Sequence, residues 1–287
     1  MSKFVYLLIT VAVLAGNTVR AQYDKYEGNL HTGELGLTLG AASYFGDLNT
    51  TGNVSHSKFA MGAFFRKQFG DYVAVRLGGQ FARVGYSDAY SKNIVQHTRN
   101  LSFNSNIWEM TLQGDFNFFR FNPVDPDFRF TPYLTFGAGA FNYNPYAYLN
   151  GVKYYLRPLH TEGQDSPLYP NRKEYSTMAA CFPIGMGFKW ALSENVNIGI
   201  EVVYRFTTTG YLDDVHGTYA GAAAFPPLPN GQPSPAYLLQ DRSYVYGTPI
   251  GIAGRQRGFT NQNDSYATGS ITLSFNLGTY LCPPVPK

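Results

Sequence analysis

Hydrophobic and polar residues alternate with a period of two along much of this chain of 287 residues. The clearest example is the segment NVNIGIEVVYRF, residues 195–206. Its apolar and aromatic positions are Val196, Ile198, Ile200, Val202, Tyr204 and Phe206, and the positions between them include Asn197, Gly199, Glu201 and Arg205. Because successive side chains of a strand point to opposite faces, this segment is predicted to be a β-strand with one apolar and one polar face.

Seven other segments show the same alternation, bounded by turn residues, and no segment has a convincing helical period. The eight predicted strands cover residues 34–46, 58–69, 71–89, 103–119, 130–143, 177–191, 196–210 and 266–277. Each is as long as, or longer than, the roughly 9 to 11 residues that a tilted strand needs to cross a bilayer.

The connections between these strands alternate in length. Short connections (GD, RFNPVDPDFR and LSEN) follow the second, fourth and sixth strands, whereas longer segments follow the first, third, fifth and seventh. A soluble sandwich, the alternative fold, has no reason to collect its long connections at one end. The predicted fold class is therefore all-β: an eight-stranded antiparallel transmembrane outer-membrane β-barrel with short periplasmic turns and long extracellular loops. Its apolar faces contact lipid and its polar faces line the lumen.

The first residues have the features of a secretory signal. Lys3 is followed by an apolar stretch, and Val19 and Ala21 are small residues at the spacing that a signal peptidase reads. We therefore expect a signal peptide at 1–21, a periplasmic N-terminal segment at 22–32, the barrel at 33–277 and a periplasmic tail at 278–287, with the protein in the outer membrane. The apolar stretch is shorter than the roughly 20 residues of a spanning helix.

Composition agrees with strands that face lipid. Only 14% of residues are charged, whereas 16% are aromatic, as expected for a barrel with aromatic girdles at both membrane interfaces. The formal net charge of +3 is not concentrated in a basic run, so nucleic acid is not an expected partner. No cofactor or metal site is expected.

Strand parity predicts which charged side chains enter the lumen. The predicted cluster comprises Arg76, Glu109, Asp115, Lys189, Glu201 and Arg205. An eight-stranded barrel is just wide enough for its own side chains to fill it, so these charges are expected to pair as a neutralised plug rather than to form an ion path or a proton relay. Porin activity is accordingly not expected.

Catalytic signals are weak. His216 follows Asp213 and Asp214 in YLDDVHGTY. In principle such acids orient a histidine base or bind a cation. However, no Ser lies nearby in the sequence, and the spacing of the acids is not that of a calcium loop. Enzymatic activity is not expected. Cys181 and Cys282 are predicted to lie at opposite ends of the barrel and therefore not to pair within one chain.

The two longest connections are rich in Tyr, Pro, Gly and Asn. This composition fits an adaptable contact surface and solvated loops over the barrel mouth equally well. The stretch AFPPLPNGQPSP is expected to lack strand pairing, because Pro cannot donate a backbone hydrogen bond, and to be mobile.

Several segments carry a resemblance to a known family. They are GELGLTLGAASYFGDLN, RNLSFNSNIWEMTLQGDFNF, FTPYLTFGAGAFNYNP, LRPLHTEGQ, NVNIGIEVVYRFTTTGYLDDVHGTY, DRS and the Cys-Pro tail. Together they resemble the PorG-type outer-membrane barrel of the Bacteroidetes type IX secretion system, over residues of about 33–283. The matching motif positions are Gly46, Asp47, Leu48, Asn49, Thr161, Glu162, Gly163, Tyr211, Leu212, Asp213 and Asp214.

The resemblance implies a non-enzymatic barrel in outer-membrane lipid. It also implies partners: the periplasmic ring built from a lipoprotein and a second subunit, tied to the membrane near the translocon, in an apparatus that also delivers adhesins in gliding members of the phylum. All three motif segments are predicted to lie outside the cell. We therefore expect the ring to contact residues 120–129, 22–32 and 278–287, whereas the motif loops would meet another outer-membrane subunit or the surface. The alternative is a free-standing barrel for envelope stability or surface ligand binding.

Overall fold

The computed structural model describes residues 31–278. The signal peptide at 1–21, most of the segment at 22–32, the tail after Gly278 and Cys282 lie outside the described residues, so the expectations for them stay predictions. Within residues 31–278 no helix is both long and apolar enough to cross a membrane.

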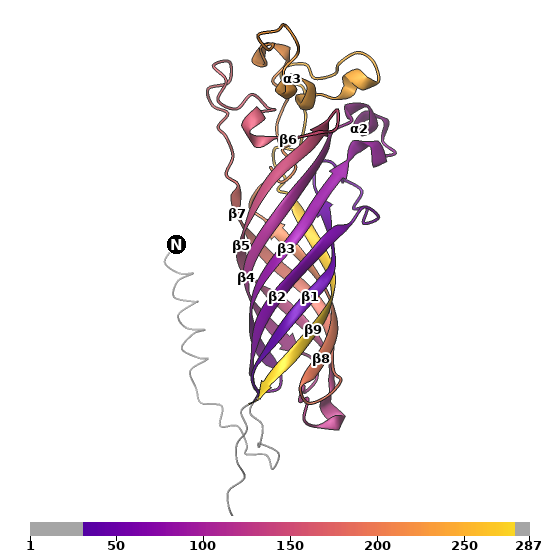
Figure 1. Cartoon of the computed structure of the whole chain (residues 1–287), viewed down its shortest axis with the longest axis vertical. Helices are drawn as coiled ribbons and strands as arrows, with labels where there is room; N and C mark the ends of the chain where they lie inside the picture. The colour runs from indigo at the N-terminus through magenta and orange to yellow at the C-terminus, as the bar shows by residue number, and fades with distance from the viewer. Residues whose placement is uncertain (1–30, 279–287) are drawn as a thin grey trace, which may run out of the picture. The chain divides into compact units, whose positions relative to one another are not determined.

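Eight strands form a closed antiparallel barrel, as predicted (Figure 1). They are β1 (His31–Phe45), β2 (Lys58–Phe69), β3 (Val73–Ser87), β4 (Ser102–Asn117), β5 (Phe130–Leu149), β7 (Met178–Ala191), β8 (Val196–Thr207) and β9 (Ser265–Gly278). Each barrel strand pairs with its neighbours along the chain, and β1 closes the barrel by pairing with β9. β6 pairs with the last residues of β5 and is not one of the eight barrel strands, so the next barrel neighbour of β5 is β7. The pairing β4–β5 leaves the barrel without a free edge.

The orientation of the side chains follows the predicted parity. Trp108 and Met110 point outward and are 61% and 66% exposed, whereas Glu109 between them points inward and is 4% exposed. The same alternation is present in β8, where Ile200 and Val202 are exposed and Glu201 is buried. The outer face of the barrel is therefore apolar and its interior is polar, the arrangement of a barrel that crosses a membrane with its strands.

Short and long connections lie at opposite ends. The short turns, residues 70–72, 118–129 and 192–195, are at one end, and η2 (Pro126–Phe128) is part of the second. The long outer connections, residues 46–57, 88–101, 150–177 and 208–264, gather at the other end, where Figure 1 shows α2, α3 and β6 above the barrel. We call this group of connections the cap.

The cap contains regular structure that alternation did not predict. It comprises β6 (Val152–Tyr155), η1 (Asp88–Tyr90), α2 (Ile94–Arg99), η3 (Arg157–Leu159), η4 (Ala222–Ala224), α3 (Pro235–Gln240) and η5 (Ser243–Val245). The prediction of no helix is therefore wrong for α2 and α3, which have six residues each and are too short to show a helical period. Side-chain caps supply their signal instead: Asn93 accepts a hydrogen bond from the Val95 N–H and Ser234 accepts one from the Tyr237 N–H.

Strand bounds differ from the prediction mainly at the cap end of β5, which continues six residues further and turns back as β6 through Asn150 and Gly151, both at positive φ. At the opposite end β1 begins at His31 and β9 ends at Gly278, and these two residues pair with each other. The hydrophobic pattern of the sequence does not predict this pairing, because the pairing joins backbone groups. Residues 224–235 contain no strand, in agreement with the prediction from their prolines.

Candidate functional site

The barrel interior holds one network of paired charges near the short turns. Arg66 on β2 contacts Glu34 on β1 at 3.0 Å and Asp115 on β4 at 2.7 Å. Arg76 on β3 lies 3.7 Å from Asp115 and 2.6 Å from Glu201 on β8. Because each carboxylate faces at least one guanidinium, the cost of burying these charges is offset by their pairing.

A second pair lies further toward the cap. The Arg205 Nε is 2.6 Å from the Glu109 carboxylate, and the other nitrogens of Arg205 donate to Thr268 at 2.8 Å and to Gln80 at 3.0 Å. Tyr266 also donates to Glu109. These contacts connect β3, β4, β8 and β9 across the interior.

Lys189 is the exception in this interior. Its side chain is buried, and its Nζ has no hydrogen-bond partner within residues 31–278. The Nζ lies 4.4 Å from the centre of the Phe121 ring and 5.5 Å from that of Tyr133. Aromatic faces therefore provide the close contacts of this cation.

All six predicted lumen side chains are buried inside the barrel, but the prediction omitted Glu34 and Arg66. In β2 two aromatic residues, Phe64 and Phe65, precede two basic ones, Arg66 and Lys67, so the alternation is hidden. Phe64 and Arg66 point inward, whereas Phe65 and Lys67 are exposed. With both added, the described strands place four acidic and four basic groups in the interior, Glu34, Glu109, Asp115 and Glu201 with Arg66, Arg76, Lys189 and Arg205.

The space left between these side chains is small. A cavity of about 30 Å³ borders Arg76, Gln80, Glu109 and Arg205. One water molecule needs roughly 10–15 Å³ of such space, so this cavity has room for about two or three waters. It is too small for a hydrated solute.

The three motif segments meet at the outer end of the barrel. The side chains of Asp47, Asn49, Thr161, Glu162, Asp213 and Asp214 are all buried there, together with Tyr44, Arg257 and Asp264. We call these nine residues the outer junction. No pattern in the sequence predicted that the segments would come together, and none indicated Tyr44, Arg257 or Asp264 as members of the cluster.

One part of the outer junction shares a proton. The Tyr44 hydroxyl lies 2.6 Å from Asp213 Oδ2 and 2.9 Å from Asp264 Oδ1. A hydroxyl has a single proton, so it can donate to only one of the two carboxyl groups, and the other contact needs a proton on the carboxyl. Burial, reinforced by the neighbouring acids, raises the pKa of both Asp213 and Asp264 well above the usual range. One of the two is therefore expected to be a neutral acid.

A second part is centred on Arg257. Its Nη1 donates to Glu162 Oε1 at 3.1 Å, and its Nη2 lies 3.8 Å from Asp214 Oδ2. Tyr175 donates to Asp214 at 2.7 Å, and the backbone N–H of His216 donates to Glu162 at 2.9 Å. Burial still raises the pKa of Asp214 to about 6, even though Arg257 lowers it.

Asp47 and α2 complete the outer junction on the side of the first connection. The Phe259 N–H donates to Asp47 Oδ1 at 3.0 Å, and burial raises the pKa of Asp47 to about 6. Arg99, at the end of α2, donates to the backbone oxygens of Asp47 at 3.0 Å and Arg257 at 2.7 Å and forms a fork with Asp88. The first, second and fourth outer connections are thereby joined.

Two motif glycines are required by close packing. A Cβ at Gly46 would collide with the Asp264 carboxyl and the Tyr44 hydroxyl. Gly163 has a φ of +75°, and a Cβ there would lie 2.8 Å from the Ala220 Cβ. Only glycine accepts that combination without strain.

The geometry around His216 does not assemble a catalytic triad. Asp213 accepts hydrogen bonds from Tyr44 and from the Val215 N–H, so it does not orient the imidazole. The His216 Nδ1 is buried and has no hydrogen-bond partner among residues 31–278, and the ring packs on Tyr211 with 4.8 Å between ring centres. In the part of the chain that the structure describes, no group of three or more His, Cys, Asp or Glu residues is placed to hold a metal ion.

Comparisons with known proteins give a family match and similar folds. The family model of DUF6089, a domain of unknown function, matches residues 18–232. No curated protein matches the sequence. Among solved structures, the chain is similar to the N-terminal β-barrel domain of Pseudomonas aeruginosa OprF (9% identity, TM-score 0.37, covering 87% of this chain and 99% of that chain). It is also similar to Neisserial surface protein A (10% identity, TM-score 0.40, covering 86% of this chain and 97% of that chain). A third similar structure is Ail, the attachment invasion locus protein of Yersinia pestis (9% identity, TM-score 0.37, covering 88% of this chain and 99% of that chain).

Proposed function

The chain belongs to the DUF6089 family, and we propose that it is a non-enzymatic outer-membrane barrel subunit of the type IX protein secretion machinery. In this role it ties the periplasmic lipoprotein-containing ring to the outer membrane near the translocon. The barrel provides the membrane anchor, and its filled interior suits a structural part better than a conduit for solutes.

The observation that carries this proposal is the outer junction. The motif segments GDLN, TEG and YLDD, which carry the resemblance to PorG-type barrels, are separated by more than 40 residues each, yet their side chains contribute to one buried cluster. All three segments lie in outer connections, and there their side chains form one buried cluster rather than separate surface patches. The shared residues are those that determine how the cap folds onto the barrel, so the resemblance concerns a structural core as well as strand alternation.

The ring contact is proposed to lie at residues 120–129 and at the chain ends, 22–32 and 278–287, because the ring is periplasmic. The turn at 118–129 is well organised for such a contact: the Asn122 N–H donates to the Phe128 carbonyl at 2.9 Å, and the Asp127 N–H donates to the Asp125 side chain at 3.1 Å. Asp127 itself is exposed and presents its carboxylate to a partner. A surface already held in shape loses little conformational entropy on binding.

Affinity purification in mild detergent tests the proposal. We expect the tagged full-length protein to recover the ring lipoprotein and its ring partner, identified by peptide mass spectrometry. Asp127→Lys should lower that recovery several-fold. Glu194→Lys reverses an exposed acid in another turn at the same end of the barrel and serves as the matched control, so it should recover the ring like the wild type. A wild-type barrel that always purifies alone would contradict the proposal.

The second candidate is a free-standing small barrel that stabilises the envelope or binds a surface ligand. It is favoured by one specific observation, an apolar pocket of about 390 Å³ in the cap. Deleting the gene separates the two functions. Loss of the protein should block export of proteins with C-terminal sorting domains if it is a secretion subunit, and should leave export unchanged if the barrel acts alone.

A further inference from the structure

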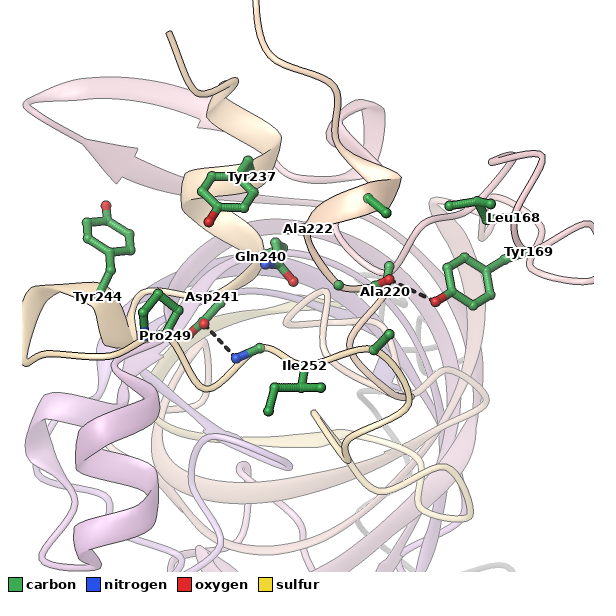
Figure 2. A pocket seen from close by; sticks show the side chains of 14 residues that line it. Leu168, Tyr169, Ala220, Ala222, Tyr237, Gln240, Asp241, Tyr244, Pro249 and Ile252 are labelled. Carbon is green, nitrogen blue, oxygen red and sulfur yellow. Dashed lines mark hydrogen bonds between the residues drawn. The ribbon is translucent and has the colours of Figure 1, made fainter.

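The cap contains an apolar pocket between its third and fourth outer connections. Figure 2 shows Tyr237 and Gln240, both from α3, facing Tyr169 from the third connection across the pocket, with Ile252 below them. Its volume of about 390 Å³ lies within the range of small-molecule sites, about 300–1,000 Å³. Most of its lining is apolar or aromatic.

Hydrogen bonds hold the polar parts of the walls in place. The Tyr169 hydroxyl donates to the Ala220 carbonyl at 2.8 Å, and the Gly251 N–H donates to Asp241 Oδ2 at 2.7 Å, as the dashed lines in Figure 2 show. The other oxygen of Asp241 accepts from the Ser243 N–H at 3.0 Å and from its hydroxyl at 2.6 Å. Both carboxylate oxygens are thus already engaged within the protein.

The two backbone segments that meet at one side of the pocket are tightly packed. The Gly254 N–H donates to the Tyr219 carbonyl at 3.0 Å. Gly221 has a φ of +77°, and a Cβ there would lie 2.9 Å from the Ala253 Cβ. The pocket is therefore a built feature of the cap rather than a gap between independent loops.

Gln240 gives the pocket its one unsatisfied polar group. Its side chain is only 3% exposed, and within the described residues its Oε1 has no hydrogen-bond partner. Its backbone oxygen accepts a hydrogen bond from Arg257 Nε at 3.2 Å, which fixes this residue to the outer junction. A buried acceptor without a donor is costly, so a ligand that supplied a donor would recover that free energy.

We infer that this pocket binds an uncharged aromatic group of one or two rings that carries one hydrogen-bond donor, such as an indole or a phenol. Tyr169, Tyr237 and Tyr244 offer ring faces and edges to such a group, and Gln240 Oε1 accepts its N–H or O–H. The side chains of Leu168 and Ile252, 57% and 65% exposed, form an apolar rim at the entrance. A charged ligand is disfavoured because Asp241 is the only charged lining residue and is already hydrogen-bonded.

This inference is independent of the secretion role, because the pocket faces away from the short turns. The aromatic group can come from a free small molecule or from a side chain of an extracellular polypeptide. The chemistry recognised is the same in both cases, and the probes below separate them.

Binding is measured by saturation-transfer NMR and by titration of the full-length protein in detergent micelles, with empty micelles as the blank. 3-Methylindole tests the free ring with its N–H donor, and 1,3-dimethylindole is nearly the same shape without the donor. N-acetyl-tryptophanamide presents the same ring on a peptide backbone. We expect 3-methylindole to bind above the blank and 1,3-dimethylindole to bind roughly 3- to 10-fold more weakly, the range for one net hydrogen bond.

Two variants connect the binding to the pocket. Gln240→Leu removes the acceptor, so it should weaken the binding of 3-methylindole roughly 3- to 10-fold. The variant should then bind 3-methylindole no more tightly than 1,3-dimethylindole. Ala222→Trp should fill the pocket and abolish binding, whereas Ala224→Trp adds the same side chain to the same turn outside the lining and should bind normally. A heat-modifiability gel verifies that each variant retains its closed barrel.

The outcomes are distinct. Binding of N-acetyl-tryptophanamide at least as tight as that of 3-methylindole supports the inference with a polypeptide as the source, and weaker binding supports it with a free molecule. The inference is overturned if 3-methylindole binds no better than to empty micelles. It is also overturned if Gln240→Leu and Ala222→Trp bind like the wild type. Preference for the cation tryptamine over 3-methylindole would contradict the uncharged class.

Discussion

The barrel interior and the outer junction both bury many charged side chains, but they neutralise them differently. In the interior, acids and bases are equal in number and sit on strands, so that Arg66 and Arg76 each reach two carboxylates directly. The outer junction has an excess of acids on loops. There the carboxyl groups accept hydrogen bonds from backbone N–H groups and tyrosine hydroxyls, and one acid retains its proton, as at Tyr44 and Asp213.

The two regions should therefore respond to different changes. Breaking a buried ion pair on the closed sheet should destabilise the whole barrel at any pH at which both groups are charged. Acids held by loops and by a retained proton should affect the cap alone, and their effect should depend on pH. Three substitutions test the contrast.

The largest effect is expected for Arg66→Ala in the interior. The change leaves Glu34 and Asp115 buried without their closest cation, and removing one member of a buried ion pair costs about 3–5 kcal/mol. Urea unfolding of the barrel in lipid vesicles, followed by gel mobility, measures the loss. Lys67→Ala removes a neighbouring charge that is exposed on the outer face, and should change the free energy of unfolding little. Equal effects of the two substitutions would refute the contrast.

A local effect is expected for Arg257→Ala in the cap. Glu162 and Asp214 lose their shared guanidinium, which should cost about 3 kcal/mol, or about 100-fold faster amide hydrogen exchange across residues 208–264. The barrel strands should retain their protection. Arg255→Ala is the control, since Arg255 is exposed and makes a single long hydrogen bond to the Ile250 carbonyl at 3.4 Å. Loss of strand protection in Arg257→Ala would show that cap and barrel are one cooperative unit.

The smallest effect per substitution is expected for a single titrating acid of the cap, at up to about 1.4 kcal/mol per pH unit. Burial raises the pKa of Asp47 and Asp214 to about 6, and it also raises that of Asp213 well above the ordinary value of about 3.9. The folded cap therefore holds protons that the unfolded cap releases. Its stability is fully present below about pH 4 and falls as the pH rises through the folded pKa values, by up to about 1.4 kcal/mol per pH unit for each such group.

Asp213→Asn isolates one of these groups. The amide mimics the neutral acid, since its oxygen can accept from the Val215 N–H and its NH₂ can donate to the Tyr44 hydroxyl. Amide hydrogen exchange, corrected for intrinsic rates, measures the protection of the cap. Between pH 4.5 and 7.5 this protection should therefore fall less steeply in Asp213→Asn than in the wild type. Asp165→Asn alters an exposed acid of the third connection and should keep the wild-type slope. A slope equal to that of the wild type in Asp213→Asn would mean that Asp213 is ionised in the folded cap, because such a group exchanges no proton on unfolding in this pH range.

Much of the barrel could be predicted from the sequence because its signals are local. The alternation of residues such as Trp108, Glu109 and Met110 depends only on the two-residue period of a strand, and the number of strands follows from counting such segments. The prediction was incomplete where that local signal is ambiguous. At Phe64–Lys67 two doublets hide the parity, and α2 and α3 are too short for their period to be recognised.

Period-two patterning was therefore enough to predict the fold class, the outward apolar face and most of the charges that enter the lumen, because it assigns each side chain of a strand to one face. Only the tertiary structure decided that Tyr44, Glu162, Asp213, Arg257 and Asp264 meet in one cluster, and that Gln240 closes a pocket beside it. The physical reason is that these contacts join residues up to 220 positions apart. Their proximity depends on the register that closes the barrel and on the packing of four loops over one opening, and neither is encoded in any single segment.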